Sequence, residues 1–189
     1  MENLMKAAVM QIDEKVLTAC GKFFQTHGLK LLCAESMTAG YLSTLWSLEF
    51  NSGDYFLGSL VCYDNQCKTK LLSVSKNKIE KYCAESAVVT LRMLDGLSAS
   101  SIPGADVFIS VTGLAYKTNN PRQKREVGTV YYAFQYRKEK RIYKKQFSGD
   151  PSTILMQTCN SIFRDLIAWL PTVIKKAEKH ISSNMSKID

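Results

Sequence analysis

The sequence is poor in the residues that most often build metal centres and disulfide frameworks. Its 189 residues include two histidines, and none of its six cysteines stands in a Cys-x-x-Cys pair. We therefore expect neither a metal site nor a disulfide framework, and we expect the thiols to be reduced and buried. His27 lies in a predicted turn and His180 near the C-terminus, so a Ser-His-Asp triad is not expected either.

Long apolar runs are also lacking. No stretch approaches the ~18–20 apolar residues that span a bilayer, and residues 1–10 contain Glu2 and no long apolar core of a signal peptide. Hydrophobic residues make up 46% of the chain and charged residues 22%, which excludes a disordered chain and favours one domain. We expect a cytoplasmic protein that contacts no membrane, with its domain over residues 1–171 and a basic tail over 172–189.

Helical and strand patterns alternate along the chain. Apolar residues recur at helical spacing in six stretches, which predict helices over 4–27, 39–50, 65–72, 76–82, 84–100 and 152–170. Short apolar runs predict strands over 29–34, 56–63 and 106–111, and a hairpin over 127–136 and 141–147. Gly28 is expected to end the first helix, Thr38 to cap the second, and the segment from Val173 to fray. Strands that alternate with helices before a final hairpin indicate an α/β fold with a mixed sheet.

The net charge of +8 is concentrated in one segment. Ten of the 25 basic residues lie between Lys117 and Lys145, where the acidic residues are Glu126 and Glu139. Such a segment could bind the phosphates of a nucleotide or a nucleic acid. Aromatic residues that could stack on bases interleave it: Tyr131, Tyr132, Phe134, Tyr136 and Tyr143. We favour the other interpretation, an edge strand protected by lysines, with most of the aromatic residues packed in the core.

Three loops follow predicted strands, where α/β folds gather their ligands. They span residues 35–39, 63–68 and 112–117. In the first loop, Ser36 and Thr38 precede a predicted helix, whose free backbone N–H groups suit a phosphate or another anion. The alternative is a simple capping turn in which Thr38 caps the helix and Glu35 faces water.

The second loop places Tyr63 five residues before Lys68, which lies one turn into a predicted helix. A lysine acts as a general base only when neutral, so its pKa must fall from about 10.4 through burial or a nearby charge. A tyrosine hydroxyl could orient a nucleophile or donate to an oxyanion. These are the parts of a serine amidase without histidine; the alternative is a surface lysine. In the third loop, Gly113 either lets a ligand approach the backbone or forms a tight turn.

Five motifs in these loops and in the hairpin occur in a fixed order and spacing. They are Glu35-Ser36-x-Thr38-x-Gly40, Phe56-x-Gly58-x-x-Val61-x-Tyr63-x-Asn65-x-x-Lys68, Ser110-Val111-Thr112-Gly113-x-Ala115, Val127-Gly128-Thr129-Val130 and Phe147-Ser148-Gly149-Asp150. Together they resemble the CinA C-terminal domain family, whose characterised members are nicotinamide-nucleotide amidohydrolases. The resemblance covers roughly residues 5–170 and is closest to the form without the partner domain that is fused to some members.

The resemblance implies a three-layer α/β/α sandwich, usually a homo-oligomer. It implies hydrolysis of the carboxamide of nicotinamide mononucleotide to nicotinate mononucleotide and ammonia, a step of pyridine-nucleotide salvage, with no metal or cofactor. Tyr63 and Lys68 match the family's catalytic tyrosine and lysine. The residues that match its substrate-binding loops are Glu35, Ser36, Thr38, Gly40, Asn65, Thr112 and Gly113.

Three departures from the family pattern bear on activity. The position that we assign to the family's nucleophilic serine is Gly53 here, which leaves the neighbouring Ser52 as the expected nucleophile. The third loop usually continues Ala-Gly-Pro, and here it carries Tyr116 in place of that glycine. The last helix usually carries an arginine that is absent from residues 154–157, and residues 122–125 could replace its charge.

These observations leave three hypotheses. The first is an amidohydrolase with Lys68 as base, Tyr63 assisting and Ser52 as nucleophile. The second is a family member that keeps the pocket and binds a nucleotide or a protein without catalysis, as Gly53 and Tyr116 indicate. The third, which we rank last, is a nucleic-acid-binding protein that uses the basic segment, whose binding would fall steeply with salt.

Overall fold

The structure, a computed structural model, describes residues 11–100, 102–117 and 125–185. Its five strands form one sheet in the order β2-β1-β3-β4-β5. β1 (Leu31–Glu35) pairs in parallel with β2 (Phe56–Val61) and β3 (Val107–Gly113). β4 (Thr129–Tyr136) and β5 (Glu139–Gln146) add antiparallel strands. The predicted mixed sheet is confirmed, and its parallel half brings the carboxyl ends of β1, β2 and β3 to one edge.

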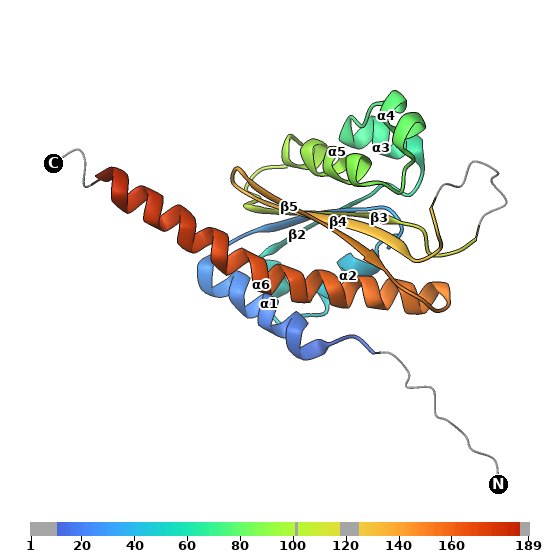
Figure 1. Cartoon of the computed structure of the whole chain (residues 1–189). Helices are drawn as coiled ribbons and strands as arrows, with labels where there is room; N and C mark the ends of the chain where they lie inside the picture. The colour runs from blue at the N-terminus through green and yellow to red at the C-terminus, as the bar shows by residue number, and fades with distance from the viewer. Residues whose placement is uncertain (1–10, 101, 118–124, 186–189) are drawn as a thin grey trace, which may run out of the picture.

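Helices cover both faces of the sheet, as Figure 1 shows. α1, α2 and α6 lie on one face, and α3, α4 and α5 lie on the other. Their bounds are α1 Glu14–His27, α2 Tyr41–Ser47, α3 Asn65–Leu72, α4 Lys76–Tyr82, α5 Ala87–Ser98 and α6 Pro151–Met185, with a short 3-10 turn, η1, over Ser52–Asp54. The α/β/α sandwich is therefore confirmed.

β1 shows why the central strands are mainly apolar. Successive side chains of a strand point to opposite faces. Leu31 and Cys33 pack in the core beneath α1, α2 and α6, while Leu32 and Ala34 pack in the core beneath α3, α4 and α5. A strand covered on both faces is apolar on both, which gives a nearly continuous apolar run rather than an alternating one. All six cysteines are free thiols, and four of them are fully buried.

The first helix is shorter than its apolar pattern predicts. α1 begins at Glu14, so the prediction of a helix from residue 4 is wrong over residues 11–13, and residues 4–10 lie outside the described residues. The Asp13 side chain accepts a hydrogen bond from the backbone N–H of Val16 and caps the helix. The backbone N–H of Asp13 in turn donates to Asn160 on α6 at 2.8 Å. Gly28 ends α1 in the left-handed conformation, with φ +61°, as predicted.

The second and fifth helices also differ from their predicted extents. α2 begins at Tyr41 rather than at residue 39, and Gly40, not Thr38, occupies its N-cap. α5 begins at Ala87 rather than at residue 84, because Ser86 caps it with a hydrogen bond to the backbone N–H of Val89. In both cases the chain stays irregular for several residues before the helix, and these irregular segments line the site described below.

The last helix continues well beyond its predicted end. α6 runs through Pro171 to Met185, so the prediction of a helix that ends at Leu170 and a chain that frays from Val173 is wrong. Val173 and Ile174 are buried in the core shared with α1. This burial stabilises the helix past a proline, which removes one backbone hydrogen bond.

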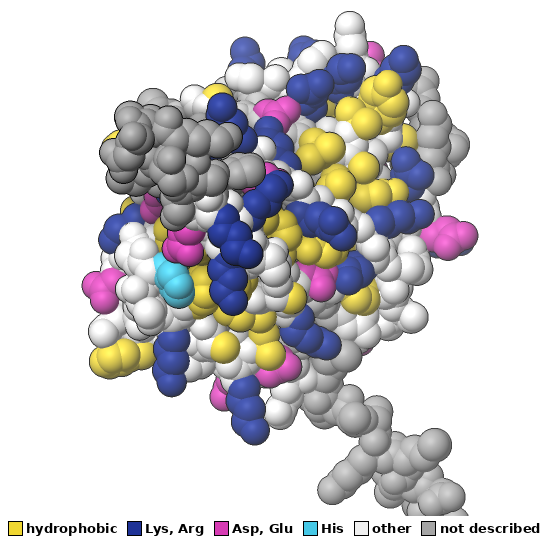
Figure 2. Space-filling view, turned by 60° about the vertical axis from the view of Figure 1, so that its left-hand side comes forward, with side chains coloured by type: hydrophobic (Ala, Val, Ile, Leu, Met, Phe, Trp, Pro, Cys, Tyr) yellow, Lys and Arg dark blue, Asp and Glu magenta, His cyan; other side chains and the backbone are white. Residues whose placement is uncertain are grey.

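The basic segment forms an edge of the sheet. β5 pairs only with β4 among the described strands, and three of its charged residues form ion pairs with other elements. Lys140 pairs with Asp95 on α5, and Lys145 pairs with Asp165 on α6. Most of the aromatic residues of β4 are buried, which fits packing rather than base stacking. Figure 2 shows basic, acidic and apolar side chains intermingled on the face it displays, rather than one continuous basic surface. These features favour the edge-strand interpretation.

Candidate active site

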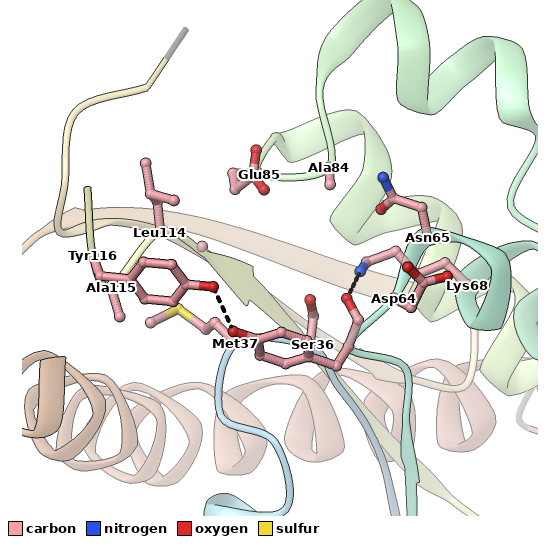
Figure 3. A pocket seen from close by; sticks show the side chains of 12 residues that line it. Ser36, Met37, Asp64, Asn65, Lys68, Ala84, Glu85, Leu114, Ala115 and Tyr116 are labelled. Atoms are coloured by element: carbon pink, nitrogen blue, oxygen red, sulfur yellow. Dashed lines mark hydrogen bonds between the residues drawn. The ribbon is translucent and has the colours of Figure 1, made fainter. Parts of the chain in front are cut away.

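The loops after β1, β2 and β3 meet in a pocket of about 240 Å³. Figure 3 shows the side chains that line it. The first loop contributes Ser36, the second contributes Tyr63 and leads into Lys68 on α3, and the third contributes Tyr116. A fourth segment, the turn between α4 and α5, adds Glu85. The pocket therefore lies at the carboxyl ends of parallel strands, where the sequence predicts a ligand site.

Lys68 is held in an unusual environment for a lysine. It lies in the first turns of α3, its side chain is 1% exposed, and its Nζ donates to the backbone carbonyls of Cys62 and Tyr63 at 2.9 Å each. Burial lowers the pKa of Lys68, and the opposing effect of nearby acidic groups, Glu85 first among them, does not cancel it. A neutral amine can donate two hydrogens to the two carbonyls and still present its lone pair to a proton. Lys68 is therefore suited to act as a general base, and the surface-lysine alternative is wrong.

Tyr63 and Tyr116 meet at one side of the pocket. Their hydroxyl oxygens are 2.8 Å apart, and about half of each side chain is exposed. The hydrogen bond to Tyr116 is the main cause that raises the pKa of Tyr63, so this phenol stays protonated at neutral pH. A protonated phenol can donate a hydrogen bond, which suits a role in holding a carbonyl oxygen. Tyr116 thus engages the tyrosine that the family resemblance marks as catalytic.

Ser36 lies at the floor of the pocket, between Tyr116 and Lys68 in the view of Figure 3. It follows β1 directly, and its backbone N–H donates to the carbonyl of Val111 on the neighbouring β3 at 3.0 Å. This bond fixes the serine relative to the sheet. Ser36 is thus a hydroxyl residue that shares one pocket with Lys68 and Tyr63.

Glu35 performs a structural task. Its side chain is fully buried, and its carboxylate accepts hydrogen bonds from the hydroxyls of Thr38 and Ser43 and from three backbone N–H groups at the start of α2. The carboxylate therefore replaces the missing side-chain cap of Gly40 and lies at the positive end of the helix. The alternative in which Glu35 faces water and Thr38 caps the helix is wrong. Thr38 and Gly40 shape the loop and do not line the pocket.

The other predicted binding residues divide between the pocket and its support. Asn65 and Gly113 line the pocket. Thr112 is buried and its hydroxyl donates to the carbonyl of Ala84 at 3.2 Å, so it fixes the turn between α4 and α5. A Cβ on Gly113 would lie 2.5 Å from the Met37 sulfur and 2.7 Å from the Thr129 carbonyl. Gly113 is therefore required by close packing around it.

Ser52 lies away from the pocket. It belongs to η1, which precedes β2, whereas Tyr63 and Lys68 follow β2. The six residues of β2 span about 20 Å at ~3.3 Å each. The Ser52 hydroxyl donates to the carbonyl of Ser47 at the end of α2. The structure thus separates Ser52, the nucleophile expected from the sequence, from Lys68, the expected base.

The sequence analysis did not identify Glu85, nor did it foresee that the hydroxyls of Tyr63 and Tyr116 are in contact. Glu85 falls inside a stretch that the pattern assigns to a helix, and the break comes at Cys83, whose φ is +68°. An acidic residue in a predicted helix is ordinary, so the pattern gave no signal that Glu85 belongs to the site. Among the described residues, no group of three or more histidine, cysteine or acidic side chains is placed to hold a metal ion, and no helix is long and apolar enough to cross a bilayer.

Comparison with known proteins identifies the family. The family model of the CinA C-terminal domain matches residues 5–170, so the chain belongs to this family. The chain is 34% identical over 139 residues to a protein of Enterobacter agglomerans named nicotinamide-nucleotide amidohydrolase PncC, a match that covers 72% of this chain and 82% of that protein. It is 34% identical over 145 residues to a CinA-like protein of Geobacter sp. (strain M21), covering 77% of this chain and 34% of that one. The chain spans between a third and two fifths of the length of the first curated relatives it matches.

A solved structure shows the same fold. The competence damage-inducible protein A of Klebsiella pneumoniae superposes with a TM-score of 0.79 at 22% identity, over 85% of this chain and 98% of that one. The five-stranded mixed sheet flanked by helices is therefore the fold of the CinA structures.

Proposed function

We propose that this chain is an amidohydrolase that converts nicotinamide mononucleotide to nicotinate mononucleotide and ammonia. The observation that carries the proposal is that Ser36, Lys68 and Tyr63 line one pocket, in which burial lowers the pKa of the lysine. The name of the Enterobacter agglomerans relative and the family motifs supply the substrate. The pocket supplies a nucleophile, a base and a hydrogen-bond donor, which are the groups that amide hydrolysis requires.

In the first half-reaction, the Ser36 oxygen attacks the carboxamide carbon while neutral Lys68 accepts the hydroxyl proton. Tyr63 donates a hydrogen bond to the oxygen that becomes negatively charged. When the C–N bond breaks, protonated Lys68 returns its proton to the leaving nitrogen, which departs as ammonia. An ester between Ser36 and the nicotinoyl group remains.

In the second half-reaction, water attacks the ester carbon while Lys68 again accepts a proton. The bond to the Ser36 oxygen breaks, the serine recovers its proton from Lys68, and nicotinate mononucleotide leaves. This scheme assigns to Ser36 the nucleophile role that we expected of Ser52, because Ser36 shares the pocket with Lys68.

The proposal is tested by incubating the purified chain with nicotinamide mononucleotide and measuring ammonia and nicotinate mononucleotide together. We expect the two products in equal amounts, and a loss of about 10³-fold or more in Lys68→Met, because the base is removed while the length of the side chain is kept. Absence of both products from the unmodified protein contradicts the proposal.

A second candidate function is binding without turnover. The bond between the Tyr63 and Tyr116 hydroxyls favours it, since it occupies the phenol that would act on the substrate. In that case the nucleotide binds the unmodified chain, but no ammonia appears. Tyr116→Gly restores the family residue and frees the Tyr63 hydroxyl from its hydrogen bond to Tyr116.

A further inference from the structure

Two acidic side chains line the pocket, and they differ in what they contact. The Asp64 carboxylate caps α3 and accepts from the backbone N–H of Gln66 at 2.6 Å. Glu85 comes from the turn before α5, where its backbone carbonyl accepts from the Arg125 side chain at 3.2 Å. No ion pair or hydrogen bond of the Glu85 carboxylate is found among the described residues. The backbone of Glu85 is thus anchored while its carboxylate lines the pocket.

The position of Glu85 relates it to the reacting groups. Figure 3 shows Glu85 on the wall opposite Ser36, with Tyr116 on a third side. A substrate whose amide carbon reaches Ser36 must fill a pocket of only about 240 Å³, so the ring that carries the amide lies among these side chains. Tyr63 and Tyr116 add aromatic surface to the same pocket. A carboxylate together with aromatic rings is complementary to a flat, positively charged group.

We propose that Glu85 makes this pocket selective for an amide carried on a positively charged aromatic ring. The inference rests on the proposed function and specifies the charge of its substrate. Nicotinamide mononucleotide in its oxidised form carries a pyridinium cation. Its reduced form has the same amide, ribose and phosphate on an uncharged dihydropyridine ring. The pocket is therefore expected to prefer the oxidised nucleotide.

Glu85 also connects the ring charge to the base. The groups that raise the pKa of Lys68 against the effect of burial are Glu85, Asp64 and the thiols of Cys62 and Cys67. A cation bound beside Glu85 offsets the largest of these effects. Lys68 then loses its proton more readily when the pyridinium substrate is present, which places the neutral base in the complex rather than in the empty protein.

The test measures binding of the two nucleotides to the full chain by calorimetry, in a Ser36→Ala background that prevents turnover. We expect this protein to bind the oxidised form about tenfold more tightly than the reduced form, the scale of one partly desolvated charge interaction. Adding Glu85→Gln should remove that preference, chiefly by weakening the oxidised form. Adding Glu80→Gln, which removes an exposed carboxylate of α4 outside this pocket, should leave it unchanged.

Three results overturn the inference. The first is equal affinity of the Ser36→Ala protein for both nucleotides, and the second is an equal loss of affinity for both when Glu85→Gln is added. The third is that the Ser36→Ala protein binds neither nucleotide. Different results would contradict the proposed function. If the unmodified chain releases no ammonia but the preference exists and depends on Glu85, the inference stands and hydrolysis is wrong. If ammonia is released and Glu85→Gln leaves the preference intact, hydrolysis stands and the inference is wrong.

Discussion

The Tyr63 hydroxyl lies 2.8 Å from the Tyr116 hydroxyl, in the lining of the pocket that holds Lys68. The two residues come from loops after different strands, β2 and β3. The bond therefore joins two sides of the site through side chains that are themselves half exposed. Tyr116, which stands where the family pattern usually has a glycine, is thus in direct contact with Tyr63, which matches the family's tyrosine.

Tyr116→Phe removes this hydrogen bond and keeps the ring. The pKa of Tyr63 should then fall toward its ordinary value, because the bond to Tyr116 is the first cause that raises it. The measurement is the tyrosine absorbance as a function of alkaline pH, with Tyr63→Phe used to identify the signal. An unchanged titration of Tyr63 in Tyr116→Phe contradicts the coupling.

The pKa of Lys68 makes both activity and stability depend on pH. Since the folded pKa lies below the unfolded value of about 10.5, the unfolded chain binds more protons between these two values, and stability rises with pH across that window. Lys68→Met should remove this contribution. The unfolding free energy of the unmodified chain, relative to that of Lys68→Met, should therefore increase as pH rises toward 10.5.

Activity should also rise with pH, because Lys68 must be neutral to act as the base. The acid limb of kcat/KM should have its midpoint below the ordinary lysine value. Chemical denaturation and initial rates at a series of pH values measure the two effects. A difference in stability that is flat with pH would show that Lys68 has its ordinary pKa.

Glu35→Gln should destabilise the fold. The carboxylate is fully buried and accepts five hydrogen bonds from the loop and the start of α2, and an amide cannot accept them all. We expect a loss of about 2–4 kcal/mol in unfolding free energy. Urea denaturation measures it, with the exposed Glu80→Gln as the control. Equal stabilities of the two variants would contradict the structural role.

Gly113→Ala and Gly53→Ala form a matched pair. A Cβ on Gly113 meets the Met37 sulfur and the Thr129 carbonyl, whereas a Cβ on Gly53 meets nothing within 4 Å. We expect Gly113→Ala to lower stability by about 1–3 kcal/mol and to displace Met37 from the pocket, and Gly53→Ala to change little. Thermal unfolding separates them. A neutral Gly113→Ala would mean that β4 and Met37 shift at no cost.

The sequence predicts the sheet well because each central strand is a short, mainly apolar run. α3 and α4 have the predicted bounds. The helix predicted over 39–50 is shortened to Tyr41–Ser47, and it begins two residues later than predicted because the carboxylate of Glu35 caps it in place of Thr38. The prediction that the chain frays from Val173 was wrong because contacts of Val173 and Ile174 with distant residues stabilise the helix. The local sequence, which contains Pro171, does not indicate these contacts. The pocket itself was predicted through Lys68 and Tyr63. Glu85 was not placed there, and the contact of Tyr116 with Tyr63 was not foreseen, because both depend on how the loops fold together.

The assignment of Ser36 as nucleophile is tested most directly by comparing ammonia release from nicotinamide mononucleotide by Ser36→Ala and Ser52→Ala. We expect Ser36→Ala to lose turnover by about 10³-fold or more while its affinity for the nucleotide remains. Ser52→Ala should keep the activity of the unmodified chain, and Gly53→Ser should gain none. Turnover that survives Ser36→Ala but is lost in Ser52→Ala would show that Ser36 is not the nucleophile.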